Sequence, residues 1–394
     1  MFNFTATPPL SLYIHIPWCV RKCPYCDFNS HAVREGIPEQ AYVDALVADL
    51  EQDLPEVWGR VVDSIFIGGG TPSLFSPQAI ERLLGAIRAR ITLKPDAEVT
   101  LEANPGTVDR VRFAGFHTAG INRLSLGIQS FQDGLLEKIG RIHDARAAMM
   151  AVEAAQHAGF ENINLDLMFG LPGQTIDQAL TDLRTAAAMQ PAHISWYELT
   201  IEPNTWFHRH PPEQPGDALL WDMQTAGREL LAAAGYARYE VSAYALPGKE
   251  CRHNLNYWQF GDYLGIGAGA HGKLSAAATQ TITRSARTRH PRSYLDTAPG
   301  AERIASRTML TPADALLEYA MNALRLDCGF SKAGFTAATG LPATAIEQPV
   351  SQGIDRGLLI AADNVIRTTP AGQRYLNELL QLWVPEAMHD AETG

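Results

Sequence analysis

Residues 12–28 read LYIHIPWCVRKCPYCDF, an apolar, strand-like run that leads directly into three cysteines spaced C-x3-C-x2-C. Cys19, Cys23 and Cys26 therefore share one short loop. Three thiolates in one loop can reach three corners of a metal centre, and soft sulfur ligands favour an iron-sulfur cluster or zinc over hard cations. Because the two remaining cysteines lie far along the chain, we expect one metal position to stay open for chemistry or a small-molecule ligand.

A structural zinc site is the alternative interpretation of this spacing. Zinc in such a site needs a fourth ligand, and His15 or His31, which flank the loop, could supply it. Neither remaining cysteine belongs to a second paired motif of the kind that closes many zinc sites. The spacing alone leaves both metals open, and the motifs further along the chain favour the cluster.

The chain has 394 residues, 46% of them hydrophobic and 19% charged, which fits one large α/β domain with a smaller one. Its net charge of −11 argues against nucleic acid as a partner, because phosphate backbones require a basic surface. The segment 284–292, RSARTRHPR, is a local basic exception that could meet an acidic partner or simply be solvated. No membrane-spanning run or export signal is visible, and free thiols suit a reducing compartment, so we expect a cytoplasmic location.

Strand-like runs alternate with amphipathic helical stretches over the first half of the chain. The runs lie at residues 12–16, 64–67, 98–102, 123–127, 162–167 and 193–199. This alternation predicts parallel β/α units, and Ser76 and Thr175 are placed as N-caps of two of the helices. Such units can close fully or partly into a barrel with its reactive groups at the C-terminal strand ends, although periodicity alone leaves a doubly wound sheet open.

Polar motifs follow four of these strands in succession. They are the glycine turn at 68–71, Glu102 in LEANPGT, Gln129 in GIQSF and Asp166 in NLDLMFGLP. The glycines let backbone groups approach a ligand closely, which suits the amino and carboxylate groups of an amino acid-like cofactor. The three side chains could hydrogen-bond amine or ribose hydroxyl groups. Their matching positions predict a single site at the mouth of the barrel.

Together the cluster loop, GGGTPSL, LEANPGT, GIQSF and NLDLMFGLP resemble the radical S-adenosylmethionine superfamily. The match is narrower with its coproporphyrinogen dehydrogenase-like branch, and within it with the HemW-type haem chaperones. The resemblance implies a partial (β/α)6 barrel in which Cys19, Cys23 and Cys26 hold a [4Fe-4S] cluster and S-adenosylmethionine binds the fourth iron. It implies cofactor contacts at Tyr13, Tyr25, Gly69, Gly70, Thr71, Glu102, Gln129, Arg141 and Asp166.

Residues 253–258, HNLNYW, form a second motif that the haem chaperones share. By resemblance, haem is the cargo and His253 is the first candidate for its iron ligand, with Tyr257 and Trp258 as packing surfaces. The alternative is a structural histidine satisfied by its neighbours, and His271 is the next candidate ligand.

The composition divides the chain into three regions. We expect a barrel at 1–210, a smaller α+β segment at 211–300 that carries HNLNYW, and a winged-helix-like module at 301–394. Thr311 begins a helix in the last region with a capping pattern. The would-be recognition helix at 346–356 has almost no positive charge, which indicates a cap or interaction domain rather than a DNA reader.

Three functions compete: a haem chaperone, an oxygen-independent coproporphyrinogen III dehydrogenase, and a zinc-stabilised protein without redox chemistry. The dehydrogenase has a further cysteine two residues after its third cluster cysteine, where this chain has Phe28, and a long N-terminal extension before the cluster strand. In this chain the cluster strand begins at about residue 11, so both the missing cysteine and the missing extension favour the chaperone. No catalytic residue is assigned, and cleavage of S-adenosylmethionine is left open.

The resemblance also implies the partners. They are haem and haem-accepting proteins, among them membrane-bound respiratory enzymes, which would require peripheral contact with the inner face of the membrane. A homodimer is left open.

Overall fold

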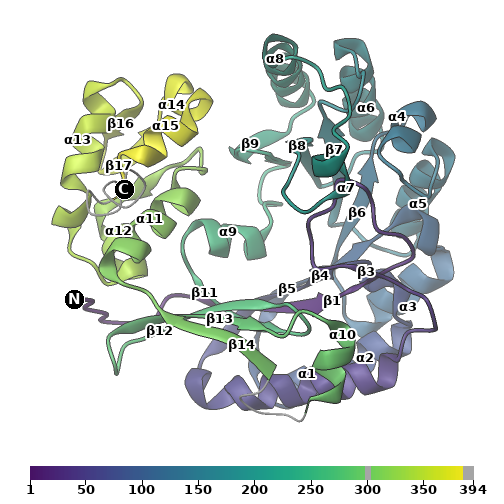
Figure 1. Ribbon diagram of the computed structural model, residues 1–394, viewed down its shortest axis with the longest axis horizontal. Helices are drawn as coiled ribbons and strands as arrows, with labels where there is room; N and C mark the ends of the chain where they lie inside the picture. Colours follow the sequence, from purple (N-terminus) through teal and green to yellow (C-terminus); the bar gives the residue numbers. More distant parts are fainter. Residues whose placement is uncertain (298–302, 385–394) are drawn as a thin grey trace.

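The computed structural model describes residues 1–297 and 303–384. Six parallel strands stand side by side in chain order at the centre of a twelve-stranded sheet (Figure 1). They are β1 (Leu10–Ile16), β4 (Val61–Gly69), β5 (Thr92–Ala103), β6 (Arg123–Gln129), β7 (Ile163–Phe169) and β8 (His193–Glu198). A doubly wound sheet would reverse its strand order, whereas these strands run on without a reversal. The predicted partial (β/α)6 barrel is therefore confirmed.

The helices that connect these strands cover the outer face of the sheet (Figure 1). They are α1 (Glu39–Asp53), α2 (Pro77–Arg88), α3 (Arg110–Ala119), α5 (Ala145–His157) and α6 (Ile176–Ala188), with α8 (Asp217–Ala233) after β8. The short helices α4 (Asp133–Lys138) and α7 (Trp206–Arg209) instead belong to a separate hydrophobic cluster against which Tyr25 of the cysteine loop packs. Ser76 accepts a hydrogen bond from the amide of Ala79, and Thr175 forms a capping box with Gln178. The two predicted helix starts are confirmed, because each cap satisfies an amide that the first turn leaves free.

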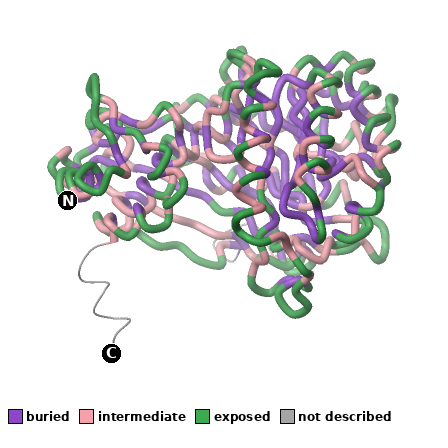
Figure 2. The backbone as a smooth tube through the Cα atoms, turned by 90° about the horizontal axis from the view of Figure 1, so that it is seen from above, coloured by how far each residue is buried: buried purple, intermediate pink, exposed green. Residues whose placement is uncertain are grey.

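The inner face of the barrel strands is polar, although it is buried. Ser11, Ser64, Ser125, Asn164 and His193 are each at most 5% exposed and alternate with the apolar residues that pack beneath the helices. Figure 2 shows buried backbone along these strands and exposed turns around them. Buried polar side chains need partners, so this face is suited to a hydrogen-bonded network or a ligand.

The sheet continues beyond the barrel on both edges. On one edge β11 (Asp262–Ile266) pairs in parallel with β1, and β12 (His271–Ala276), β13 (Thr281–Arg287) and β14 (Ile304–Met309) follow in antiparallel order. On the other edge β10 (Ala243–Ala245) and β9 (Ala237–Glu240) follow β8. The helix α9 (Arg252–Trp258) crosses between the two edges, and α10 (Pro291–Asp296) follows β13. The predicted extension thus shares one sheet with the barrel.

The C-terminal region has a hydrophobic core of its own, which includes Tyr319, Phe335 and Trp383. It contains α11 (Pro312–Ala323), β15 (Phe330–Ser331), α12 (Lys332–Thr339), α13 (Glu347–Asp355), β16 (Leu359–Ala362), β17 (Val365–Thr368), α14 (Pro370–Arg374) and α15 (Leu376–Gln381). Helices followed by a β-hairpin are the predicted winged-helix-like order. Phe2 and Phe4 from the start of the chain pack into the same core.

The expected boundaries at residues 210/211 and 300/301 stay predictions, and the second falls in 298–302, outside the described residues. Across the described parts of the chain, none of the helices combines the length and the apolar character that crossing a membrane requires.

Candidate functional site

A cavity of about 260 Å³ opens at the C-terminal ends of β4 to β7, where the cluster loop folds over them. Eleven of the predicted site residues line it: Cys19, Cys23, Tyr25, Cys26, Gly69, Gly70, Thr71, Glu102, Gln129, Arg141 and Asp166. Side chains separated by up to about 150 positions in the sequence therefore meet in one place, as the strand-end motifs predict.

The cluster loop is tied to the barrel by backbone hydrogen bonds. The amide of Gly70 donates to Ile16 O at 2.8 Å and that of Thr71 donates to Trp18 O at 2.7 Å. A Cβ atom at Gly70 would lie 2.5 Å from Trp18 O, so only glycine allows this approach. The short strands β2 (Trp18–Cys19) and β3 (His31–Ala32) pair and close the base of the loop.

Each cysteine sulfur of the loop has a hydrogen-bonding neighbour, and none of the three is in a disulfide. Thr71 Oγ1 donates to Cys19 Sγ at 3.4 Å and Arg141 Nη1 donates to Cys23 Sγ at 3.6 Å. The Ser30 hydroxyl lies 3.7 Å from Cys26 Sγ. Burial raises the pKa of Cys19 and Cys26, and these hydroxyl contacts oppose the rise. Donors around the sulfurs are what a thiolate-held cluster requires, so the residues fit the predicted group.

The alternative zinc ligands have other partners. His15 is almost completely buried, and its two ring nitrogens lie 3.0 Å from Tyr13 Oη and 2.9 Å from Asn29 O. His31 Nε2 lies 3.2 Å from Asn29 Oδ1. Within residues 1–297 and 303–384, no three His, Cys, Asp or Glu side chains converge on a position for a single metal ion. In a [4Fe-4S] cluster each cysteine binds a different iron, so its ligands need not converge in this way.

Two half-buried carboxylates line the cavity. Glu102 Oε2 accepts a hydrogen bond from the amide of Gly69 at 3.0 Å. Burial raises the pKa of Glu102 to about 8, and the negative charge of Asp166 adds to the rise. Asp166 accepts from Ser125 Oγ at 2.8 Å and from Asn164 Nδ2 at 2.9 Å, and burial raises its pKa as well. Such groups are suited to the amine or hydroxyl donors of a ligand, which would favour their charged forms.

Gln129 and Arg141 also line the cavity, where each is held by a hydrogen bond. Gln129 has a positive φ of 72°, beside an irregularity in the pairing of β6 with β7, which turns its side chain at the strand end. Its Oε1 accepts a hydrogen bond from Tyr197 Oη at 2.8 Å. Arg141 Nη2 donates to Gly127 O at 2.5 Å, while its other terminal nitrogen contacts the cysteine loop. Tyr197 lines the cavity and was not among the predicted residues.

Tyr13 is the predicted cofactor residue that does not line the cavity. It lies deeper in the barrel, where its ring neighbours are Phe66, His15 and His253. Contact between Tyr13 and S-adenosylmethionine stays a prediction, and so do the contacts predicted for the residues that line the cavity.

His253 lies on α9 and is 1% exposed. Its Nδ1 lies 3.0 Å from Ser64 Oγ and its Nε2 lies 2.9 Å from Tyr257 Oη. Burial lowers its pKa to about 3, so the ring is neutral. This geometry is that of the structural histidine considered as the alternative. Haem ligation by His253 stays a prediction, and it requires that the ring give up one of these two contacts.

The comparisons with known proteins agree with this site. Residues 13–186 match the Radical SAM superfamily and residues 310–375 match the HemN C-terminal domain. The chain is 48% identical over 379 residues to the Heme chaperone HemW of Escherichia coli (strain K12), which covers 96% of this chain and 99% of that protein. It is 50% identical over 383 residues to the Heme chaperone HemW of Haemophilus influenzae, with the same coverage of both chains.

Among solved structures, the coproporphyrinogen III oxidase HemN of Escherichia coli superposes with a TM-score of 0.80 over 96% of this chain and 90% of that one. At 21% sequence identity this similarity shows the fold alone. The fold and the cysteine loop define a radical S-adenosylmethionine protein. Within that superfamily the chain belongs to the HemW family.

Proposed function

We propose that this protein is a haem chaperone, which binds haem and delivers it to haem-requiring proteins with a [4Fe-4S] cluster and S-adenosylmethionine in the cavity. The observation that carries the proposal is the 48–50% identity, over almost the full length of both chains, to two proteins named Heme chaperone HemW. Both halves of the chain take part in that match, the cysteine loop as well as the C-terminal module.

Different residues of the cavity would hold the cluster and the cofactor. Cys19, Cys23 and Cys26 would hold three irons, and the cluster, when bound, supplies one-electron chemistry at its open iron. Glu102 and Asp166 are half-buried acceptors that would bind the donor groups of S-adenosylmethionine. Arg141 lies between the cysteine loop and Gly127, so it would orient the loop relative to the cofactor.

Oxygen-independent coproporphyrinogen III dehydrogenase is the second candidate, because the fold superposes on HemN. Against it stands Phe28, which occupies the position of a further cysteine in that enzyme and is 59% exposed at the edge of the cluster cavity. An exposed phenylalanine offers neither a thiolate ligand nor a proton, so a step that needs the cysteine is not supported.

We infer the remaining partners from the same proposal. The acceptors would be haem proteins, including membrane-bound respiratory enzymes, and delivery to them would take place from the cytoplasm by peripheral contact with the inner face of the membrane. A homodimer would be compatible with such a carrier.

Anaerobic reconstitution followed by three assays tests the proposal. We expect about four irons per chain, stoichiometric haem binding by absorbance titration, and no conversion of coproporphyrinogen III to protoporphyrinogen IX. Turnover of coproporphyrinogen would replace the proposal by the enzyme. Zinc without iron or acid-labile sulfide would exclude both.

A further inference from the structure

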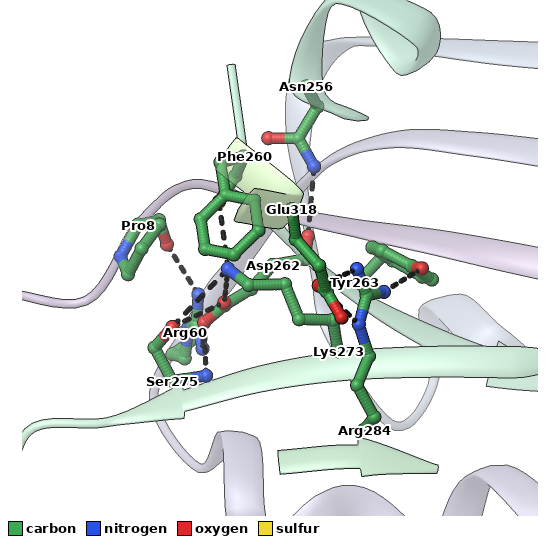
Figure 3. Close-up of polar contacts among 10 residues, drawn as sticks. All are labelled: Pro8, Arg60, Asn256, Phe260, Asp262, Tyr263, Lys273, Ser275, Arg284 and Glu318. Atoms are coloured by element: carbon green, nitrogen blue, oxygen red, sulfur yellow. Dashed lines mark hydrogen bonds and ion pairs between the residues drawn. The ribbon is translucent and has the colours of Figure 1, made fainter. Parts of the chain in front are cut away.

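The helix α9, which carries the HNLNYW motif, is anchored at its C-terminal end by a buried ionic network (Figure 3). Asn256 Nδ2 donates to the backbone oxygen of Asp262 at 2.9 Å. The Asp262 carboxylate in turn accepts from Arg60 Nη1 at 2.8 Å, Lys273 Nζ at 3.1 Å and Ser275 Oγ at 2.9 Å. Because Asp262 and Lys273 are at most 1% exposed, this end of the helix is held firmly.

The N-terminal end of α9 is anchored to different partners, on β5 and β9. Cys251 is the N-cap residue, and its amide donates to Tyr239 Oη at 3.3 Å. Glu98 Oε1 accepts from the amide of His253 at 3.2 Å and from the Cys251 thiol at 3.5 Å. The start of the helix is therefore positioned by Glu98 of the barrel strand β5 and by Tyr239 of the edge strand β9.

From Tyr239 a chain of hydrogen bonds leads to the cofactor cavity. Tyr239 Oη lies 2.9 Å from His193 Nε2, and His193 Nδ1 lies 2.6 Å from Asn164 Oδ1. Asn164 Nδ2 donates to Asp166 Oδ1 at 2.9 Å. Asp166 lines the cavity, so four hydrogen bonds join Cys251, the N-cap of the motif helix, to the site.

The directions of these bonds follow from their ends. The amide of Asn164 donates to Asp166, so its oxygen must accept from His193 Nδ1–H. His193 Nε2 is then an acceptor for the hydroxyl of Tyr239, whose oxygen accepts the Cys251 amide. Every donor in the chain points toward the Asp166 carboxylate, and hydrogen bonds aligned in this way strengthen one another.

The middle of the chain and its helix end are shielded from water, whereas Tyr239 and Asp166 are half-buried. Asn164 is 2% exposed, and His193 and Cys251 are completely buried. Burial and the nearby Arg123 guanidinium hold the pKa of His193 well below its ordinary value, which keeps the ring in the single neutral form that the chain needs. If one of these buried hydrogen bonds breaks, its donor and its acceptor are both left without a partner. A shift of Asp166 at one end of the chain is therefore opposed by the hydrogen bonds that lead to Cys251 at the other end.

We propose that Asn164, His193 and Tyr239 are positioning residues that couple the cofactor cavity to α9. They hold the Asp166 carboxylate at the cavity and set the position of the Cys251 end of the helix. Binding of S-adenosylmethionine at Asp166 then orders the start of the HNLNYW motif. The inference rests on the proposed function only in that S-adenosylmethionine occupies the cavity.

Amide hydrogen exchange over residues 251–258 of the cluster-loaded protein tests this coupling. Saturating S-adenosylmethionine should slow exchange in this segment by about fivefold or more. Tyr239→Phe, which removes one oxygen from the chain, should reduce the response to less than about twofold. The matched control is Tyr236→Phe, which removes a buried hydroxyl that donates to Pro191 O at 2.8 Å outside the chain, and it should keep the full response.

An unchanged response in Tyr239→Phe, or no response in a parent protein that binds S-adenosylmethionine by calorimetry, would overturn the inference. If Tyr239→Phe fails to fold, His193→Gln breaks the chain one link further on and takes its place with the same expected result. Haem titration of the same samples separates the two proposals. Loss of haem binding with an intact α9 response counts against the chaperone alone, and the reverse result counts against the coupling alone.

Discussion

Gly70→Ala should loosen the cluster loop from the barrel. The new Cβ atom would lie 2.5 Å from Trp18 O and 2.9 Å from Ile16 O, whereas ordinary contacts begin at 3.4 Å. Those oxygens accept the two backbone hydrogen bonds that join the loop to the glycine turn. Relieving the contact by several tenths of an ångström would cost about 1–3 kcal/mol for overpacking. Weakening the two hydrogen bonds would add about 1 kcal/mol each.

The expected loss is therefore roughly 3–5 kcal/mol in the free energy of unfolding. Urea denaturation measures it, and the iron content after reconstitution should fall because the loop carries all three ligands. Gly85→Ala is the matched control, since Gly85 lies on the exposed side of α2 with no atom within 4 Å of the new Cβ. It should be neutral or more stable by about 0.5–1 kcal/mol. Parent-like stability and iron content in Gly70→Ala would refute this account of the loop.

Three further predictions concern charge and metal. Burial raises the pKa of Glu102 to about 8, so the folded metal-free protein should lose stability as the pH rises from the ordinary carboxyl pKa to that value. Between about pH 6 and pH 9 this loss should amount to about 2–3 kcal/mol in urea titrations, and Glu102→Gln should abolish it. Lys273→Met should lower the free energy of unfolding by about 3–5 kcal/mol because it breaks a buried ion pair with Asp262. Lys94→Met breaks an ion pair whose two partners are partly exposed, so it should cost less than about 1 kcal/mol. Equal shifts in melting temperature for the two variants would contradict this contrast. Replacing the three loop cysteines by alanine should remove the iron while circular dichroism stays that of the folded protein, and retained iron would assign other ligands.

The order of strands and the place of the site follow from local patterns. In β7 the alternate residues Ile163, Leu165, Leu167 and Phe169 pack in the main core, while Asn164 and Asp166 share the inner face two positions apart. That spacing is visible in the sequence, and it could have identified Asn164 as a neighbour of the predicted Asp166.

Partners that come from distant segments could not be predicted. β11 pairs with β1 although about 250 residues separate them, and no local pattern specifies which edge receives a late strand. Similarly, Ser64 lies 189 positions from His253 in the sequence. Their contact decides whether the His253 imidazole has a hydrogen-bond partner or is free to bind haem iron. Sequence patterns report which face of an element is buried, whereas they do not report what it is buried against.

The most direct test of the haem chaperone measures haem transfer from cluster-loaded protein to a haem-depleted respiratory enzyme, followed by absorbance and by recovered activity of the acceptor. Apomyoglobin serves as a passive sink that reports spontaneous release. We expect transfer to accelerate with acceptor concentration and to exceed the rate of spontaneous release. Transfer at the spontaneous rate, independent of acceptor concentration, would contradict it.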